Sequence, residues 1–118
     1  MLLFRITFFD FYLIESYTID RIVKEDLQME FIKEEKAFRH YNAAGEVDAE
    51  ITYTLEEEGV IGADHTFVNP SLRGQGVARQ LVERLAVYAR EENLKVRPIC
   101  SYVVELFKKS TDYDDIKI

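Results

Sequence analysis

Residues 64–78, DHTFVNPSLRGQGVA, combine residue types suited to holding a phosphorylated ligand. Within them Arg73, Gly74 and Gly76 follow an apolar, strand-like run and precede a stretch of helical periodicity. Glycine lets the main chain turn sharply and lets a ligand approach it closely. The first N–H groups of a helix lack partners within the helix and lie at the positive end of its dipole. The segment therefore predicts a site for a diphosphate.

Two familiar phosphate loops are excluded by the residues around this segment. No Gly-Lys-Ser or Gly-Lys-Thr follows, so the loop is not of the Walker type. The dinucleotide fingerprint G-x-G-x-x-G would need glycine at position 79, which is Arg79. On spacing alone, a purely structural turn between a strand and a helix stays open as the alternative.

A cysteine and a histidine on neighbouring predicted strands could act as a nucleophile and its base. Cys100 ends a predicted strand, and the N-terminus of the helix that follows would lower its thiol pKa. His65 lies on the predicted neighbouring strand and could take the thiol proton in a Cys–His pair. Two alternatives stay open, in which Cys100 is a small buried apolar residue and His65 is a structural residue.

Length, charge and cysteine content limit the classes of protein to consider. A chain of 118 residues has room for one domain. Its net charge of -7 argues against a general nucleic-acid binder, which needs a basic face. Its single cysteine excludes an intrachain disulfide framework and a multi-cysteine metal site, and fits a reducing cytoplasm. We expect a cytoplasmic protein with no metal and no nucleic-acid partner.

The first 14 residues, MLLFRITFFDFYLI, are apolar but do not read as a membrane segment. They carry Arg5 and Asp10 and fall short of the roughly 20 residues that a spanning helix needs. A basic start and a small-residue cleavage site are missing from them. We therefore expect neither a signal peptide, nor a transmembrane helix, nor a membrane partner.

The periodicity becomes regular near residue 29, which divides the chain into an extension, 1–28, of unclear role and a domain, 29–118. Within the extension, 2–9 could be a strand and 18–27 a helix. Within the domain, alternating apolar residues predict strands over 30–34, 36–41, 47–55, 60–68 and 95–100, and helical spacing predicts helices over 77–92 and 102–109. Turns are expected at 42–45 and at Gly59, and Asn93 and Ser101 are predicted helix caps.

The order of these elements predicts an α/β (α+β) fold. Strand 60–68 is apolar on both faces and should be central. A helix joins it to strand 95–100, so the two strands are expected to run parallel in a right-handed β-α-β unit. The earlier strands, joined by short turns, are expected to form an antiparallel sheet.

Residues 73–78, RGQGVA, resemble the coenzyme loop of the GNAT superfamily of acetyl-CoA-dependent N-acetyltransferases, whose pattern is Arg/Gln-x-x-Gly-x-Gly/Ala. Residues 29 to about 113 resemble in particular the short, stand-alone GNAT-like subfamily of bacteria and animals. The shared features are an Ala-Glu-Ile-Thr-Tyr strand at 49–53, an Asp-His-Thr-x-Val segment at 64–68, and a cysteine at the end of the later strand, Cys100.

The resemblance implies acetyl-CoA as co-substrate and no metal. The diphosphate would lie on the N–H groups of residues 75–78, and the pantetheine arm would run along the strand at 66–68 toward the opening beside strand 95–100. The cofactor-binding residues implied are Thr66, Phe67, Val68, Arg73, Gly74, Gln75, Gly76, Val77 and Ala78. The catalytic candidates are Cys100 and His65.

Two departures from the family pattern affect the expected chemistry. Phe107 stands where many GNAT enzymes carry a tyrosine that protonates the departing thiolate. Glu34 and Glu35 join the first two strands directly, so the two helices that usually wall the acceptor site have no room. We expect an N-acetyltransferase acting on an unidentified amine, with Cys100 as acyl acceptor or proton donor, and a monomer or weak homodimer.

The departures also suggest rival functions. One is a module that binds coenzyme A or senses acyl groups without turnover. Another is an interaction domain that pairs through residues 1–14.

Overall fold

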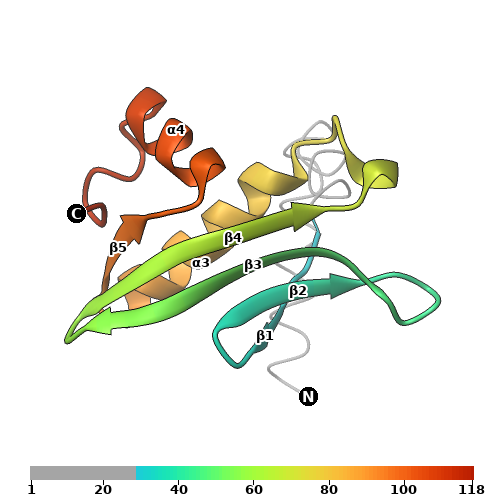
Figure 1. The fold of residues 1–118 in the computed structure, drawn as a ribbon, viewed down its shortest axis with the longest axis horizontal. Coiled ribbons are helices and arrows are strands. Elements are labelled where there is room, and N and C mark those ends of the chain that lie inside the picture. Colours follow the sequence, from blue (N-terminus) through green and yellow to red (C-terminus); the bar gives the residue numbers. More distant parts are fainter. Residues whose placement is uncertain (1–28) are drawn as a thin grey trace, which may run out of the picture.

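A computed structural model describes residues 29–118 of the chain. The extension 1–28, with its expected strand at 2–9 and helix at 18–27, lies outside the described residues. The elements in chain order are β1 (Ile32–Glu34), β2 (Ala37–Tyr41), β3 (Val47–Glu57), β4 (Val60–Val68), the 3-10 turn η1 (Pro70–Leu72), α3 (Val77–Glu91), β5 (Lys95–Pro98) and α4 (Ser101–Lys109). Figure 1 shows α3 crossing one face of the sheet and α4 following β5.

Residues 29–118 build one sheet in the order β1-β2-β3-β4-β5. The first four strands are antiparallel, and β5 pairs parallel to β4 through the crossover helix α3. This confirms the expected α+β fold with one parallel β-α-β unit. Glu35 and Lys36 form the whole connection between β1 and β2, so within the described residues no helix separates these strands.

Helix α3 supplies one side of the core. Its apolar residues recur at helical spacing, so they form one stripe that faces the sheet. The chain leaves the helix through Asn93, which has a φ of 62°, and the N–H of Leu94 bonds the carbonyl of Ala89 at 2.7 Å. This left-handed ending is the cap that the sequence predicts at Asn93. The buried residues of the stripe are Val77, Leu81, Val82, Leu85, Ala86 and Ala89.

Strand β3 alternates as expected in its middle but not at its ends. Ala49, Ile51 and Tyr53 are buried against the helix side, whereas Leu55 is 68% exposed because the strand there runs past the helix into the β3–β4 turn. Asp48 alternates with these apolar residues in the sequence, which predicts a solvent-facing side chain, but it is buried. A register shift between β2 and β3 brings its carboxylate within 2.7 Å of His40 Nδ1.

The junction of β5 and α4 also differs from the prediction. The strand stops at Pro98, not at residue 100, because β4 and β5 part beyond that point. Helix α4 begins at Ser101, and its N-cap is Cys100 rather than Ser101. The cysteine therefore lies in the turn between strand and helix, with an extended backbone.

The chain after α4 folds back over the core. The side chain of Tyr113 is completely buried and stacks on Phe107 with 5.1 Å between ring centroids. Its hydroxyl donates to Glu83 on α3 at 2.5 Å. The main chain of Lys117 pairs with Val96 of β5 in an isolated parallel β-bridge. The C-terminal segment thus holds α3, α4 and β5 together.

We predict that Tyr113→Ala is the most destabilising truncation among the tyrosines of this segment and α4. Deleting a fully buried aromatic ring leaves a cavity and costs about 3–5 kcal/mol of unfolding free energy. Tyr102→Ala is the matched control, since Tyr102 is 36% exposed and should lose far less. Urea denaturation monitored by circular dichroism measures the unfolding free energy of both variants. Equal losses would contradict the role of Tyr113 in holding α3, α4 and β5 together.

Candidate functional site: the glycine loop and the β4–β5 opening

The loop after β4 is shaped by its own side chains. Asn69 Oδ1 accepts hydrogen bonds from the amide N–H and the hydroxyl of Ser71, both at 2.9 Å, which starts the η1 turn at Pro70. Arg73 then folds back, and its Nε donates to the carbonyl of Val68 at 3.2 Å. These contacts fix the path of the chain from the end of the strand to the glycines.

The glycines turn the chain into α3 and leave the start of the helix open. Gly74 and Gly76 have φ values of 81° and 76°, which residues with a side chain adopt only at a cost. Gly76 is the N-cap and offers no capping side chain. An added Cβ at either glycine would meet nothing within 4 Å. Among the described residues, no atom therefore packs against the outer side of either glycine at the start of α3.

A hollow of about 140 Å³ lies at this place. Its position at the positive end of a helix dipole, beside a guanidinium, suits an anionic group. It takes in most of the residues that the sequence predicts for the diphosphate. Its lining is Val68, Leu72, Arg73, Gly74, Gly76, Val77, Ala78, Arg79 and Tyr102.

Strands β4 and β5 separate part of the way along β4. They pair from Val60 with Lys95 to Ala63 with Pro98, and the carbonyl of Ala63 then accepts from the N–H groups of both Ile99 and Cys100. Strand β4 continues to Val68 without a β5 partner. Its free edge, which includes Thr66 and Phe67, offers main-chain groups to an extended ligand.

Cys100 lies at this opening and contacts β4. Its Sγ is 3.4 Å from Thr66 Oγ1, and the side chain is half-buried. Burial raises the thiol pKa, but the hydrogen bond with Thr66 and the N–H groups of Val103, Tyr102 and Thr66 outweigh burial, so the pKa is lowered overall. The sulfur makes no capping hydrogen bond of ordinary length to α4, so the N–H groups act on it mainly as dipoles.

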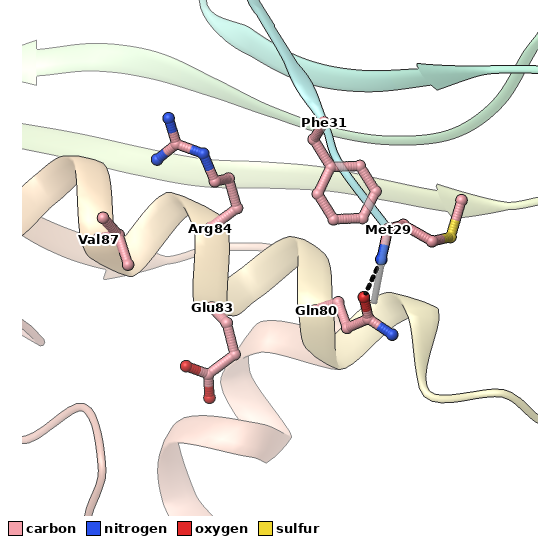
Figure 2. A pocket seen from close by; sticks show the side chains of 6 residues that line it. All are labelled: Met29, Phe31, Gln80, Glu83, Arg84 and Val87. Atoms are coloured by element: carbon pink, nitrogen blue, oxygen red, sulfur yellow. Dashed lines mark hydrogen bonds between the residues drawn. The ribbon is translucent and has the colours of Figure 1, made fainter. Parts of the chain in front are cut away.

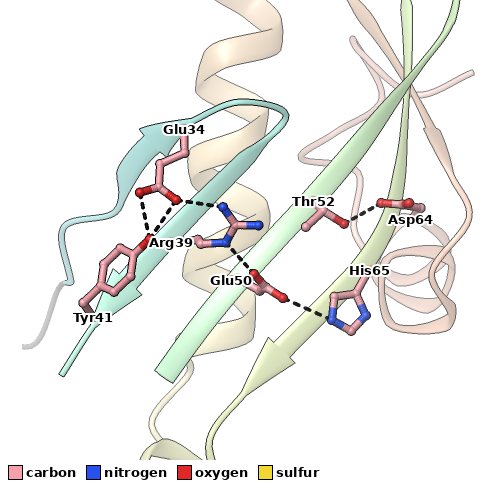
Figure 3. A network of polar contacts seen from close by, with 7 residues as sticks. All are labelled: Glu34, Arg39, Tyr41, Glu50, Thr52, Asp64 and His65. Carbon is pink, nitrogen blue, oxygen red and sulfur yellow. Dashed lines mark hydrogen bonds and ion pairs between the residues drawn. The ribbon is translucent and has the colours of Figure 1, made fainter. Parts of the chain in front are cut away.

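His65 points to the other side of the sheet from Thr66, as successive strand residues do. It is 55% exposed, and its Nε2 lies 3.5 Å from Glu50 Oε2. Glu50 in turn accepts from Arg39 Nε at 2.6 Å, and Asp64 accepts from the Thr52 hydroxyl rather than contacting His65. Figure 3 shows this network on the side of the sheet away from α3. The structure therefore does not bring His65 to Cys100.

Phe107, which stands at the position of the expected proton donor, and its neighbour Tyr113 both belong to the core. Phe107 is buried and stacks on Tyr113. Burial and the hydrogen bond to Glu83 raise the pKa of Tyr113 to about 12. Neither side chain is placed to protonate a thiolate at the β4–β5 opening. The Cys100 thiol, in contrast, contacts β4 at this opening.

We predict that Thr66→Val moves the thiol titration of Cys100 to higher pH. Losing the hydroxyl removes the largest of the contacts that lower the thiol pKa, so the thiolate forms only at higher pH. The pH dependence of alkylation by iodoacetamide measures this. Thr54→Val is the control, because Thr54 bonds Glu56 on β3 instead; an unchanged titration in Thr66→Val would contradict the assignment.

A second hollow, of about 350 Å³, lies away from the glycine loop, between α3 and the chain that leads into β1. Figure 2 shows it, with the amide of Met29 donating to Gln80 Oε1 at 2.8 Å. The guanidinium of Arg84 lies against the Phe38 ring, 4.6 Å from its centroid. None of the residues predicted from the sequence for a site lines this hollow, which includes Phe31, Glu83 and Val87.

Sequence reasoning missed one contact and one residue at the site. Thr66 was expected to bind a coenzyme, not to bond the thiol, and only the register of β4 against the β5–α4 turn reveals that contact. Tyr102 was given no role, although it lies two residues after Cys100 and could have been expected near the same opening; it lines the hollow at the glycine loop. Within residues 29–118, no group of three or more His, Cys, Asp or Glu side chains could hold a metal ion, and no described helix is long and apolar enough to cross a bilayer.

Comparison with known proteins identifies a common family. Residues 37–116 match the family described as GCN5-related N-acetyl-transferase. The chain is similar to a GCN5-like candidate N-acetyltransferase from Staphylococcus aureus, solved in solution by NMR. The two are 33% identical with a TM-score of 0.66, and the match covers 77% of this chain and 89% of that one.

A larger protein shares the fold. The crystal structure of a candidate acyl-CoA N-acyltransferase from Klebsiella pneumoniae matches with a TM-score of 0.50 at 23% identity, over 63% of this chain and 55% of that one. No curated protein matches the chain. The family match rests on the region that holds strands β2 to β5, the glycine loop and Cys100.

Proposed function

Because the chain belongs to the GCN5-related N-acetyltransferase family, and is an acyltransferase on that ground, we propose that it transfers the acetyl group of acetyl-CoA to an amine at the β4–β5 opening. The observation that carries this proposal is the alignment of three features along one path. They are the open start of α3, the unpaired edge of β4, and the Cys100 thiol at its far end.

The diphosphate of the coenzyme would lie in the hollow at the glycine loop. The N–H groups of Gln75, Gly76, Val77 and Ala78 would donate to it, and Arg73 would add positive charge. The surroundings of Gly74 and Gly76 fit this use, because no atom of the described residues would lie within 4 Å of an added Cβ at either position. The net charge of the whole chain does not oppose binding, since the phosphates meet a local cluster of donors.

The pantetheine arm would continue along Thr66, Phe67 and Val68. It would pair with the main chain of β4 in the position that β5 vacates. This path ends near the point where Ala63 accepts from Ile99 and Cys100. The thioester would therefore arrive beside the Cys100 sulfur.

Cys100 would take the acetyl group first. Its thiolate, favoured by the lowered thiol pKa, attacks the thioester carbonyl and forms a new C–S bond, while the bond to the coenzyme sulfur breaks. The coenzyme thiolate leaves and takes a proton from solvent. A neutral amine then attacks the acetyl-cysteine and forms the amide, its surplus proton goes to solvent, and the Cys100 thiolate is restored.

The acceptor amine would approach from the open side of the opening. No described helix stands between β1 and β2 to wall that side. We assign the acyl-transfer unit to residues 29–118, and a free, partly ionised thiol suits a reducing compartment such as the cytoplasm.

Two measurements test the proposal. Calorimetric titration of the full chain with acetyl-CoA should show saturable binding, and a panel of primary amines should include one that releases free coenzyme thiol. No binding at millimolar concentration would refute coenzyme recognition. Binding without thiol release or protein acetylation would refute transfer and leave only a coenzyme-binding module.

A further inference from the structure

One wall of the hollow at the start of α3 comes from a distant part of the chain. Of the described residues that line it, all but one fall within 68–79. The exception is Tyr102, in the first turn of α4. The helix whose N-cap is Cys100 therefore also contributes a residue to the wall of the hollow.

The fold does not require an aromatic ring at this position. Val103, Leu106 and Phe107 supply the buried face of α4, whereas Tyr102 is 36% exposed. A tyrosine at the rim of a hollow offers a flat apolar face with a polar tip. Such a ring suits a ligand that is apolar at that point and polar on either side.

We propose that Tyr102 is a coenzyme-binding residue whose ring packs on the pantetheine arm, between the diphosphate and the thioester. The inference rests on the proposed function. Tyr102 lines the hollow assigned to the diphosphate and lies two residues from Cys100, beside which the thioester is placed. An arm that joins these two points passes Tyr102. The methyl groups and methylenes of pantetheine give the ring an apolar surface to cover.

This contact contributes to the affinity of the chain for acetyl-CoA. Packing of the ring is made equally with acetyl-CoA before and during transfer, so it affects binding rather than the chemical step. Replacing Tyr102 should raise the KM for acetyl-CoA and leave kcat unchanged. A replacement that merely disturbed α4 would displace Cys100 and lower kcat.

The test measures binding of coenzyme A and of ADP to the full chain by calorimetry or NMR titration. ADP carries a diphosphate but no pantetheine arm. Tyr102→Ala should weaken binding of coenzyme A about tenfold and leave binding of ADP unchanged. Tyr102→Phe keeps the ring and should bind coenzyme A like the wild type.

Tyr41→Ala is the control, since it makes the same truncation on β2, where the phenol bonds Glu34 and does not line the hollow. Unchanged binding of coenzyme A by Tyr102→Ala would overturn the inference while leaving the proposed function intact. A matching loss for ADP, or for Tyr102→Phe, would also overturn it, because the contact would then be to the diphosphate or through the hydroxyl. A wild-type chain that binds no coenzyme A would remove the proposed function and this inference together.

Discussion

We expect Cys100→Ala to abolish the acetyl label that the proposed mechanism predicts for the wild-type chain, and to slow amide formation by at least about 100-fold. The side chain is the one described thiol, and it lies where β4 and β5 part, 3.4 Å from the Thr66 hydroxyl. Without it, the opening lacks the thiol that the proposed mechanism uses as acyl acceptor. Intact-protein mass spectrometry measures the label, and release of free coenzyme thiol measures the rate.

Two controls separate the thiol from the fold. Cys100→Ser keeps the size of the side chain and should bind acetyl-CoA normally, but it should acquire little label because a hydroxyl is a far weaker nucleophile at neutral pH. Alkylation of wild-type Cys100 should have the same effect on labelling. Equal labelling of the alanine variant would reject the covalent route. Loss of label with the full rate retained would show direct transfer to the amine.

The sheet was predictable because its strands carry local signals. The alternation of 47–55 and the turn at Asn42 to Gly45 are encoded by neighbouring residues, and the structure places β3 and its turn there. The crossover to β5 was predictable for a different reason. A strand, a glycine loop, a helix of suitable length and a second strand can be joined in one sheet only by a parallel pairing of the right hand.

The polar contacts of the site were not predictable from the residues that make them. His65 and Thr66 are adjacent in sequence but face opposite sides of the sheet, so one pairs with Glu50 and the other with Cys100. Choosing between them requires the register of β4, which a one-residue shift would reverse. Asp48 shows the same limit: it was expected in solvent and is buried with His40, because a register shift between β2 and β3 turns it inward.

The proposed coenzyme site and the charged network of the sheet occupy different parts of the fold. Every feature assigned to the coenzyme lies within 63–102, on elements that pack on the core. The side toward β1 and β2 instead shows a charged network of Glu34, Arg39 and Glu50, with strong mutual hydrogen bonds. These bonds raise the pKa of Arg39, chiefly through Glu50 and then through Glu34, so its guanidinium keeps its charge across the physiological range. This network lies on the face of the sheet away from α3 (Figure 3), whereas Thr66 and Cys100 meet on the opposite face, so it stands apart from the proposed thiol.

We expect Gly76→Ala to weaken binding of acetyl-CoA by about 10- to 100-fold, the loss of one or more hydrogen bonds to a charged phosphate. Gly76 caps α3 with a φ of 76°, and a Cβ there would occupy the open space that the diphosphate is proposed to enter. A methyl group would hold the phosphates away from the N–H groups of the first helical turn. Calorimetric titration of the full-length variant with acetyl-CoA measures the effect.

Gly45→Ala is the matched control for this substitution. Gly45 has a φ of 82° in the β2–β3 turn, and an added Cβ would likewise meet nothing within 4 Å. Both variants therefore suffer a similar strain in the left-handed region, of about 1–2 kcal/mol, and should lose similar thermal stability. Only Gly76→Ala should lose affinity. If both variants lost it equally, the effect would come from strain on the fold, and the start of α3 would not be where the diphosphate binds.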